Sequence, residues 1–433
     1  MIAVAPLKRI SQASGVPVHH IIGPVVGVLT GLAVVAPRSA WWLAIAFVLL
    51  FMAASVNPKQ SLLRALQPAP ATLALLLLAL WAMLSTAWAI VPTDGVLKGL
   101  LLAGMALAVT AAVRLGADLD EMAWSGLAIG LLAAMCVTGT YLAFDLWTDQ
   151  ALGRRLLNTF PALLDLFRKH VVLTGGKVTL IDDAEINRRV AVWTLLLWPC
   201  LASIGALISR RARWLVALVL LVQAAAIMVG TGHQSSQLAF VLGGAVYGLH
   251  LVSAWLARRV LLAAWCVAVF LAVPIAAVSY DLGLSRSEWL FASARDRVAL
   301  WAFAARNVME RPLLGAGANA TPQINTAIAV SKSTEPRIRE HADRPGRHSH
   351  NFYIQTWYEL GVIGAMLLFT IGLAAQRAIW LLQPQVQGQQ LANLTTIAAM
   401  VASSYGMWQP WFQGALAASV ILMTVAGLRS DRR

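Results

Sequence analysis

Long apolar runs separated by short polar or basic connections dominate this sequence. Runs of about 17 to 24 residues are long enough to cross a bilayer as helices. Twelve such runs lie at residues 17–37, 40–56, 71–92, 96–113, 121–144, 188–208, 214–230, 235–254, 260–280, 360–376, 391–408 and 412–428. The pattern predicts an all-α integral membrane protein, a single polytopic domain over residues 1–433 with about twelve transmembrane helices. The first run is expected to be retained as a span.

Composition agrees with this class. Hydrophobic residues make up 59% of the chain, charged residues 12%, and the mean hydropathy is +0.72. Such a chain is too apolar for a soluble protein. We therefore expect membrane lipids as partners and no nucleic acid. The three cysteines lie inside predicted spans, so no disulfide is predicted.

Basic residues in the short connections predict the orientation. Fourteen Lys and Arg residues fall on the side that carries both termini, against two, Arg38 and Lys98, on the other side. We therefore place both termini in the cytoplasm and two large loops in the periplasm. The loop at residues 145–187 is expected to contain an interfacial amphipathic helix, with apolar residues at helical spacing. These are Leu156, Phe160, Leu163, Leu164 and Phe167.

The second large loop, with its helical continuation at residues 281–359, carries the candidate active site. His348 and His350 stand where this loop meets a membrane helix, and a polar stripe of Asn351, Gln355 and Glu359 continues into that helix. A histidine titrates near neutrality and can accept a proton from a hydroxyl. The alternative is that both histidines simply sit at the membrane–water interface.

Arginines are the second informative feature of the outer loops. Residues 281–350 contain ten basic residues, nine of them Arg, against seven acidic ones. The planar guanidinium can grip phosphate oxygens in two places, so an anionic phosphate-bearing ligand is predicted. The candidate binding residues are Arg188, Arg189, Arg295, Arg297 and Arg347. Two alternatives stay open, namely contact with anionic lipid head groups and, for Arg188 and Arg189, pairing with the nearby Asp182, Asp183 or Glu185.

Several other kinds of catalytic site are absent from the sequence. It contains no G-x-S-x-G, no H-E-x-x-H and no Cys/His set with zinc spacing. No carboxylate stands at ligand spacing beside the His pair, so we predict no metal and no other cofactor.

A set of motifs resembles a known family. His348-x-His350-Asn351 is followed by Glu359-Leu-Gly-x-x-Gly364, and preceded by Arg297-x-x-x-Trp301 and Arg311-Pro-Leu-Leu-Gly-Ala-Gly317. This arrangement resembles the O-antigen ligase and O-antigen polymerase family of bacterial inner-membrane proteins. The twelve-span layout with a large outer loop before span ten is similar to the ligase branch. The chain departs from the family where a Ser-Arg pair is often found, because Gln237 stands where the arginine would be.

The resemblance implies a membrane glycosyltransferase fold of the GT-C-like kind and a place in the bacterial inner membrane. It implies an O-antigen ligase that transfers a polysaccharide from undecaprenyl diphosphate to the lipid A-core oligosaccharide at the periplasmic face. A polymerase would use the same donor with a second lipid-linked glycan as acceptor. A transporter of lipid-linked glycans is the alternative from another class, which predicts ionisable residues in the middle of spans. The spans are nearly free of charge.

The residues also suggest a mechanism. A lipid-linked sugar diphosphate already has a good leaving group, so the enzyme needs a base and positive charge. We expect His350, helped by His348 and Asn351, to deprotonate the acceptor hydroxyl while Arg188, Arg189 and Arg297 hold the diphosphate. Attack opposite the leaving group would invert the anomeric centre without a metal.

Overall fold

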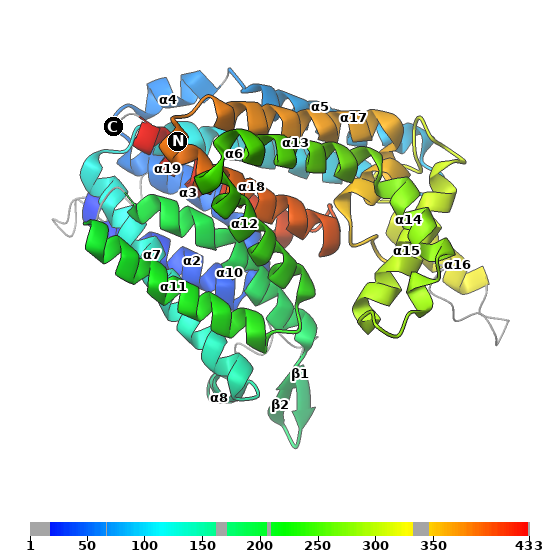
Figure 1. Cartoon of the computed structure of the whole chain (residues 1–433), viewed down its shortest axis with the longest axis horizontal. Helices are drawn as coiled ribbons and strands as arrows, with labels where there is room; N and C mark the ends of the chain where they lie inside the picture. Colours follow the sequence, from blue (N-terminus) through cyan, green and yellow to red (C-terminus); the bar gives the residue numbers. More distant parts are fainter. Residues whose placement is uncertain (1–17, 66, 162–170, 206–208, 332–345, 432–433) are drawn as a thin grey trace.

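The structure, a computed structural model, describes residues 18–65, 67–161, 171–205, 209–331 and 346–431. It is all-α apart from one short hairpin (Figure 1). The first half of the chain forms α2 (Val18–Val35), η1 (Pro37–Trp42), α3 (Leu43–Ala54), α4 (Pro58–Ala65), α5 (Pro70–Leu84), η2 (Ser85–Trp88), α6 (Gly95–Gly116), α7 (Glu121–Trp147), α8 (Ala151–Thr159), β1 (Val171–Thr174), β2 (Lys177–Ile181) and α10 (Asp183–Ile204). The second half forms α11 (Arg210–Gly230), α12 (Gln234–Val252), α13 (Ala254–Phe270), α14 (Ala272–Asp281), η5 (Leu284–Arg286), α15 (Ala292–Val308), α16 (Thr321–Ser331), α17 (Phe352–Trp380), α18 (Pro384–Ser403) and α19 (Pro410–Asp431).

The membrane-spanning character of the chain is confirmed. Within the described ranges, eight helices are long and apolar enough to cross a bilayer, or up to nine if the bent pair of α13 and α14 is one span. Helix α2 is apolar but its described part is short, and α10 and α18 fall outside this group because they carry more polar residues. Each of the twelve predicted segments nevertheless contains a helix, so the count of twelve spans stays a prediction.

Several predicted boundaries are wrong. The segment at 260–280 breaks at Leu271, where α13 and α14 meet at 68°. The segment at 391–408 ends as a helix at Ser403, and residues 404–409 form a loop. Helix α17 begins at Phe352, ahead of the apolar segment at 360–376, so the polar stripe lies on this helix as the sequence predicted and the large loop ends at Asn351. Asn351 caps that helix, because its side chain accepts a hydrogen bond of 3.1 Å from the Ile354 amide.

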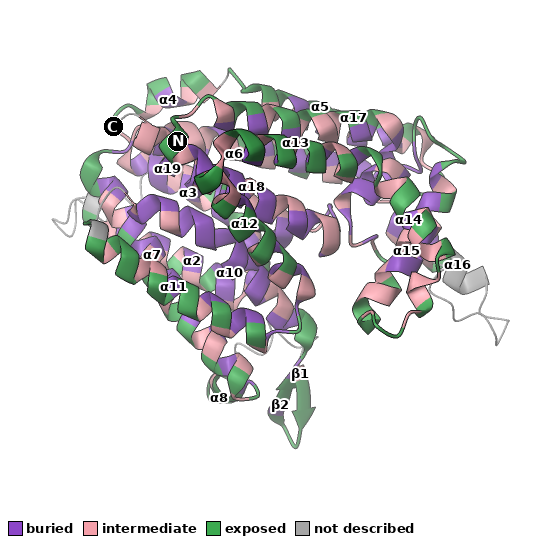
Figure 2. Cartoon of the chain, viewed as in Figure 1, coloured by how far each residue is buried: buried purple, intermediate pink, exposed green. Residues whose placement is uncertain are grey.

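Helix α10 lies at the centre of the bundle. Of its 22 residues, 17 are buried (Figure 2), and it packs against α2, α7, α11, α12, α18 and α19. Its first two turns carry charged residues, including Glu185, Arg188 and Arg189, whereas the rest contains no charged residue. Asp182 caps the helix by accepting a 3.0 Å hydrogen bond from the Ala184 amide. The central helix thus presents its charged start at one end of the bundle.

The helices of the second large loop lie to one side of the bundle. Helices α14, α15 and α16 project beyond the ends of α13 and α17 (Figure 1). Strands β1 and β2 pair antiparallel across a turn at Gly175 and Gly176. In the first large loop, α8 supplies one short helix, while Leu163, Leu164 and Phe167 of the predicted amphipathic segment lie outside the described residues.

Candidate active site

The two histidines occupy a short loop immediately before α17. His350 has a left-handed backbone conformation, with φ of 52°, which is uncommon for a residue with a side chain. This turn brings the two imidazole rings together, with their centroids 4.0 Å apart. The loop is tied to α15, because the Trp301 indole donates a 2.7 Å hydrogen bond to the Ser349 carbonyl.

That hydrogen bond explains the spacing of the Arg297-x-x-x-Trp301 motif. Residues four apart lie on the same face of a helix, one turn from each other. Trp301 is hydrogen-bonded to the loop that contains both histidines. Arg297, one turn earlier on the same face of α15, therefore also faces this loop. The charge of Arg297 contributes to lowering the pKa of both His348 and His350, so the arginine lies close enough to act on both rings.

The hydrogen bond of His350 determines which ring nitrogen can accept a proton. Its Nδ1 bonds to the main-chain carbonyl of Ser404. A carbonyl only accepts, so Nδ1 carries the hydrogen and Nε2 of the neutral ring carries the free lone pair. Burial, together with the charge of Arg297, lowers the pKa of His350 to about 4, against the opposing effect of the Ser404 bond. The ring is therefore neutral at pH 7, with Nε2 able to take a proton.

His348 lies against Gly406 of the loop at residues 404–409, which we call the α18–α19 loop. A Cβ at position 406 would come within 2.7 Å of the Cβ of His348, so the close packing requires glycine there. Burial, and then the charges of His350, Arg297 and Arg347, lower the pKa of His348 to about 3. Its Nδ1 is buried and makes no hydrogen bond with any residue that the structure describes.

Tyr405, in the same α18–α19 loop, connects the histidine cluster with the start of α10. Burial raises the pKa of its hydroxyl, while the charges of Arg188 and Arg297 act in the opposite direction. Its ring lies 5.7 Å from that of His233, and its hydroxyl has no hydrogen-bond partner within the described ranges. Arg188 and Arg297, far apart in sequence, thus act on one tyrosine beside the histidines.

The five predicted arginines have different surroundings. Arg188 forms a 2.6 Å ion pair with Glu185, which confirms the pairing alternative for this residue. Arg189 is 2% exposed and donates a 2.7 Å hydrogen bond to the Tyr141 hydroxyl, inside the bundle. Arg347 is exposed and acts on His348, whereas Arg295 is half-buried on the first turn of α15. A role for each in phosphate binding stays a prediction.

Arg297 differs from Arg188 and Arg189. It is partly buried, burial lowers its pKa, and its side chain forms no hydrogen bond or ion pair with any described residue. A half-buried guanidinium whose donors meet no described residue is suited to an anionic ligand. The role of Arg297 in holding phosphate oxygens beside His350 stays a prediction.

His233 and Gln237 occupy the turn into α12. The His233 ring is 2.7 Å from the Ser236 hydroxyl, and burial, with the charges of Arg297 and His350, lowers its pKa to about 3. The Gln237 amide donates to the Met228 and Thr231 carbonyls, at 2.7 and 3.1 Å. Gln237 thus holds the turn between α11 and α12 instead of offering a charge to the site.

Glu359 is fully buried and holds three segments together. Its carboxylate accepts hydrogen bonds from the Trp408 indole at 2.5 Å, the Asn319 amide at 2.9 Å, the Gln355 side chain at 3.1 Å and the Thr321 hydroxyl. These donors come from the α18–α19 loop, from the start of α16 together with Asn319 just before it, and from α17 itself. Gln355 and Glu359 thus form a structural junction between these segments, whereas their supporting role in the active site stays a prediction.

The glycine motifs contact each other through the main chain. The amides of Ala316 and Gly317 each donate a 2.9 Å hydrogen bond, to the Tyr358 and Glu359 carbonyls respectively. Gly315 and Gly361 have positive φ angles of 71° and 65°, and a Cβ on either would meet main-chain atoms of the other segment. The motif beginning at Arg311 therefore serves as a fixed support for the start of α17.

Replacing Glu359 by glutamine is expected to destabilise this junction. The new amide NH₂ would face the Trp408, Thr321 or Asn319 donors, leaving buried donors without acceptors at a cost of about 1–3 kcal/mol. The thermal midpoint of the purified protein in detergent should fall, whereas Glu310→Gln, an exposed change in the same loop, should leave it unchanged. Equal midpoints for the two variants would contradict this role of Glu359.

Acid is expected to destabilise the folded protein. His233, His348 and His350 have folded-state pKa values of about 3, 3 and 4, below the ordinary value of 6.5. Between these limits the unfolded chain binds more protons than the folded one, so stability falls as pH drops from about 6.5 to about 4. Thermal midpoints measured across this range should decrease, and less steeply in His348→Gln. A midpoint that rises on acidification would contradict the buried, neutral histidines.

The fold and the site together define an all-α, multi-pass membrane protein with a histidine–arginine cluster at one end of its bundle. Residues 216–369 match the model of a family described as O-antigen ligase. The match covers about a third of the chain and supports the resemblance to the O-antigen ligase family that the motifs predicted. The match contains His233, Arg297, His348, His350 and Glu359, but neither the arginines of α10 nor Tyr405. No curated protein matches the chain.

Proposed function

We propose that the protein is an O-antigen ligase that transfers a polysaccharide from undecaprenyl diphosphate to the lipid A-core oligosaccharide. The family match supports the ligase and polymerase class of reaction. The observation that carries the proposal is the geometry of His350, whose Nδ1 is held by the Ser404 carbonyl while Nε2 stays free beside Arg297. A base and a cation side by side are what glycosyl transfer from a diphosphate needs.

The reaction uses these groups in a single displacement. His350 Nε2 takes the proton of the acceptor hydroxyl as its oxygen forms a bond to the anomeric carbon. The bond from that carbon to the diphosphate oxygen breaks, and the departing undecaprenyl diphosphate keeps the electron pair. Arg297, with Arg188 and the more distant candidates Arg189, Arg295 and Arg347, compensates the negative charge that develops. Attack from the side opposite the leaving group inverts the anomeric configuration.

Binding of the donor also changes the pKa of the proposed base, His350. Arg297 lowers the pKa of His350 in the ligand-free protein. A bound diphosphate places negative charge next to Arg297 and so opposes this effect, which raises the pKa toward the range of an efficient general base. His348 and Tyr405, both packed around the same arginine and histidine, shape this environment.

The predicted orientation supports a periplasmic site in the bacterial inner membrane. His350, His233 and the start of α10 lie at one end of the bundle, at the ends of helices whose opposite ends carry the basic connections. Proteolysis or cysteine labelling of an engineered site in the loop at 281–350, in spheroplasts, tests this placement. Labelling only after membrane disruption would contradict it.

The decisive experiment is transfer of a labelled undecaprenyl diphosphate-linked glycan to purified lipid A-core by the purified protein. The reaction is run with a chelator and again with added Mg²⁺ or Mn²⁺. We expect product with inverted linkage in chelator, in line with arginines as the source of positive charge. Turnover that requires the added metal would overturn that assignment, and chain extension without transfer to lipid A-core would identify a polymerase instead.

A further inference from the structure

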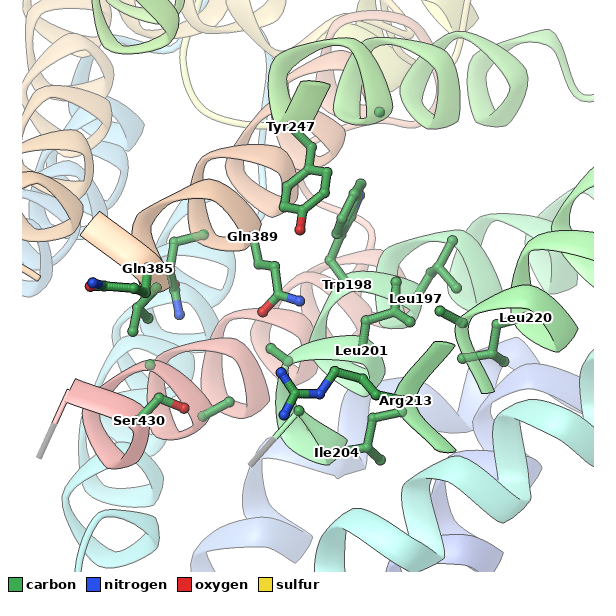
Figure 3. A pocket seen from close by; sticks show the side chains of 18 of the residues that line it. Leu197, Trp198, Leu201, Ile204, Arg213, Leu220, Tyr247, Gln385, Gln389 and Ser430 are labelled. Atoms are coloured by element: carbon green, nitrogen blue, oxygen red, sulfur yellow. The ribbon is translucent and has the colours of Figure 1, made fainter. Parts of the chain in front are cut away.

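A cavity lies at the end of the bundle opposite the histidines. It has a volume of about 1010 Å³ and is formed by the last turns of α10 and α19, the first turns of α11 and α18, and the second half of α12 (Figure 3). Along α10, residues Leu197–Gly205 that line it are separated from Arg188 by at least nine positions, or about 13 Å. The cavity is therefore distinct from the candidate active site.

The cavity exists because two consecutive helices diverge. Helix α11 packs against α7 and α10, whereas α12 packs against α18 and α13. The walls between them are apolar, with Leu197, Leu201 and Leu220 on the inside. At the rim, Trp214 and Leu251 are each 69% exposed, so the opening faces the region that hydrocarbon chains occupy. A lipid in the bilayer can therefore enter from the side.

Hydrogen-bond donors gather at one part of this cavity. The Arg213 guanidinium, the Tyr247 hydroxyl and the Gln389 amide lie around it (Figure 3), and Trp198 and Ser430 add further polar groups. Neither the Arg213 side chain nor the Tyr247 hydroxyl makes a hydrogen bond with any residue in the described ranges. None of the described residues that line the cavity is acidic, and the neighbouring Asp431 carboxylate is engaged by a 2.7 Å hydrogen bond from the Gln383 main-chain amide. The polar part is thus positively charged and suited to an anion.

The depth of the cavity favours lipids with acyl chains over lipids with long polyprenyl chains. Arg213 lies in the first turn of α11, and the apolar wall continues from it to Leu221, about 12 Å along the helix. This depth is close to half the hydrocarbon core of a bilayer, about 15 Å, which suits the acyl chains of one leaflet. A long polyprenyl chain would extend well beyond it.

We propose that the cavity between α10, α11, α12, α18 and α19 binds an anionic glycerophospholipid, with its phosphate at Arg213 and Tyr247 and its acyl chains against Leu197, Leu201 and Leu220. Arg213 belongs to the basic connections that place this end of the bundle at the cytoplasmic leaflet, whose lipids include anionic ones. The site is independent of glycosyl transfer, so its test does not depend on the proposed function.

Native mass spectrometry of the delipidated protein in detergent tests the site. Phosphatidylglycerol and phosphatidylethanolamine with the same acyl chains are titrated separately. We expect the first phosphatidylglycerol to bind about fivefold more tightly, since one basic side chain near an anionic head group contributes about 1 kcal/mol. Arg213→Gln should abolish this preference. The matched control, Arg259→Gln, should keep it, because Arg259 lies at the same end of the bundle over the Trp255 ring, outside the cavity.

A second variant tests the apolar part. Ala217 lines the cavity, so Ala217→Phe should reduce the occupancy of the first lipid of either kind while the thermal midpoint shows that the protein is folded. An unchanged preference for phosphatidylglycerol in Arg213→Gln would overturn the proposal. So would equal binding of the two lipids by the wild type. Displacement of phosphatidylglycerol by an equal concentration of a polyprenyl phosphate would assign the site to that lipid and also overturn the proposal.

Discussion

His350→Gln is expected to reduce the turnover number for glycan transfer by about 10²–10⁴-fold, the usual contribution of a general base. Glutamine can still donate a hydrogen bond to the Ser404 carbonyl, so the loop keeps its position, but its amide cannot take a proton at neutral pH. The Michaelis constant for the lipid-linked donor should change little, because Arg297 is retained. Initial rates of transfer with purified protein in detergent or nanodiscs measure both quantities.

Two histidine variants serve as comparisons for this experiment. His20→Ala, an exposed change on α2, should keep full activity. His348→Gln should give an intermediate loss, because His348 contacts the His350 ring and packs against Gly406, while its Nδ1 makes no hydrogen bond with any described residue. Full activity in folded His350→Gln protein would show that another group takes the proton, with His348 the next candidate.

The class of fold follows from the sequence because a bilayer restricts the possible structures. Within hydrocarbon, main-chain polar groups must be satisfied by the segment itself, so long apolar runs become helices. The sequence is less informative about α10 and α18, which are surrounded by other helices rather than by lipid. Helix α10 can carry Glu185, Arg188 and Arg189 because protein atoms, including the Tyr141 hydroxyl, replace water around them. Hydropathy alone does not distinguish such a helix from a solvent-exposed one.

The site could be predicted from the sequence where its residues are close along the chain. His348, His350 and Asn351 are neighbours, and Arg297 and Trp301 are one helical turn apart. The convergence of Arg188 with Arg297 depends on the packing of α10 against α12 and α18, which no short spacing encodes. Only the three-dimensional packing shows that Arg188 and Arg297 both act on Tyr405.

The α18–α19 loop was missed because it was assigned to a span. Residues 403–410 read Ser-Ser-Tyr-Gly-Met-Trp-Gln-Pro, and their polar, glycine and proline residues indicate a helix end. The apolar residues on either side of this signal are enough for hydropathy to continue the predicted span to residue 408. The loop supplies the Ser404 carbonyl to His350, Gly406 to His348 and the Trp408 indole to Glu359. Three of the predicted motif residues are thus positioned by a segment without a recognised motif.

Arg297→Gln is expected to reduce the turnover number by about 10²–10³-fold, the typical effect of removing one group that stabilises developing negative charge. It should also change the pH dependence in a defined direction. Arg297 contributes to the low pKa values of His233, His348 and His350, so its removal raises the pKa of His350 toward 6.5. The base must be neutral, so activity is lost as pH falls through this pKa. The acid limb of the kcat/KM profile should therefore move to higher pH.

Two further variants separate the charge of Arg297 from its hydrogen-bonding geometry. Arg297→Lys keeps the charge, so the acid limb should stay near its wild-type position, but the loss of the two-pronged guanidinium should still lower the turnover number. Arg306→Gln, on the same helix and stacked on the Tyr280 ring at 4.6 Å, should change neither quantity. An acid limb that stays in place in Arg297→Gln would mean that Arg297 does not act on the base. A limb that moves without loss of turnover would mean that the diphosphate is held by the arginines of α10 instead.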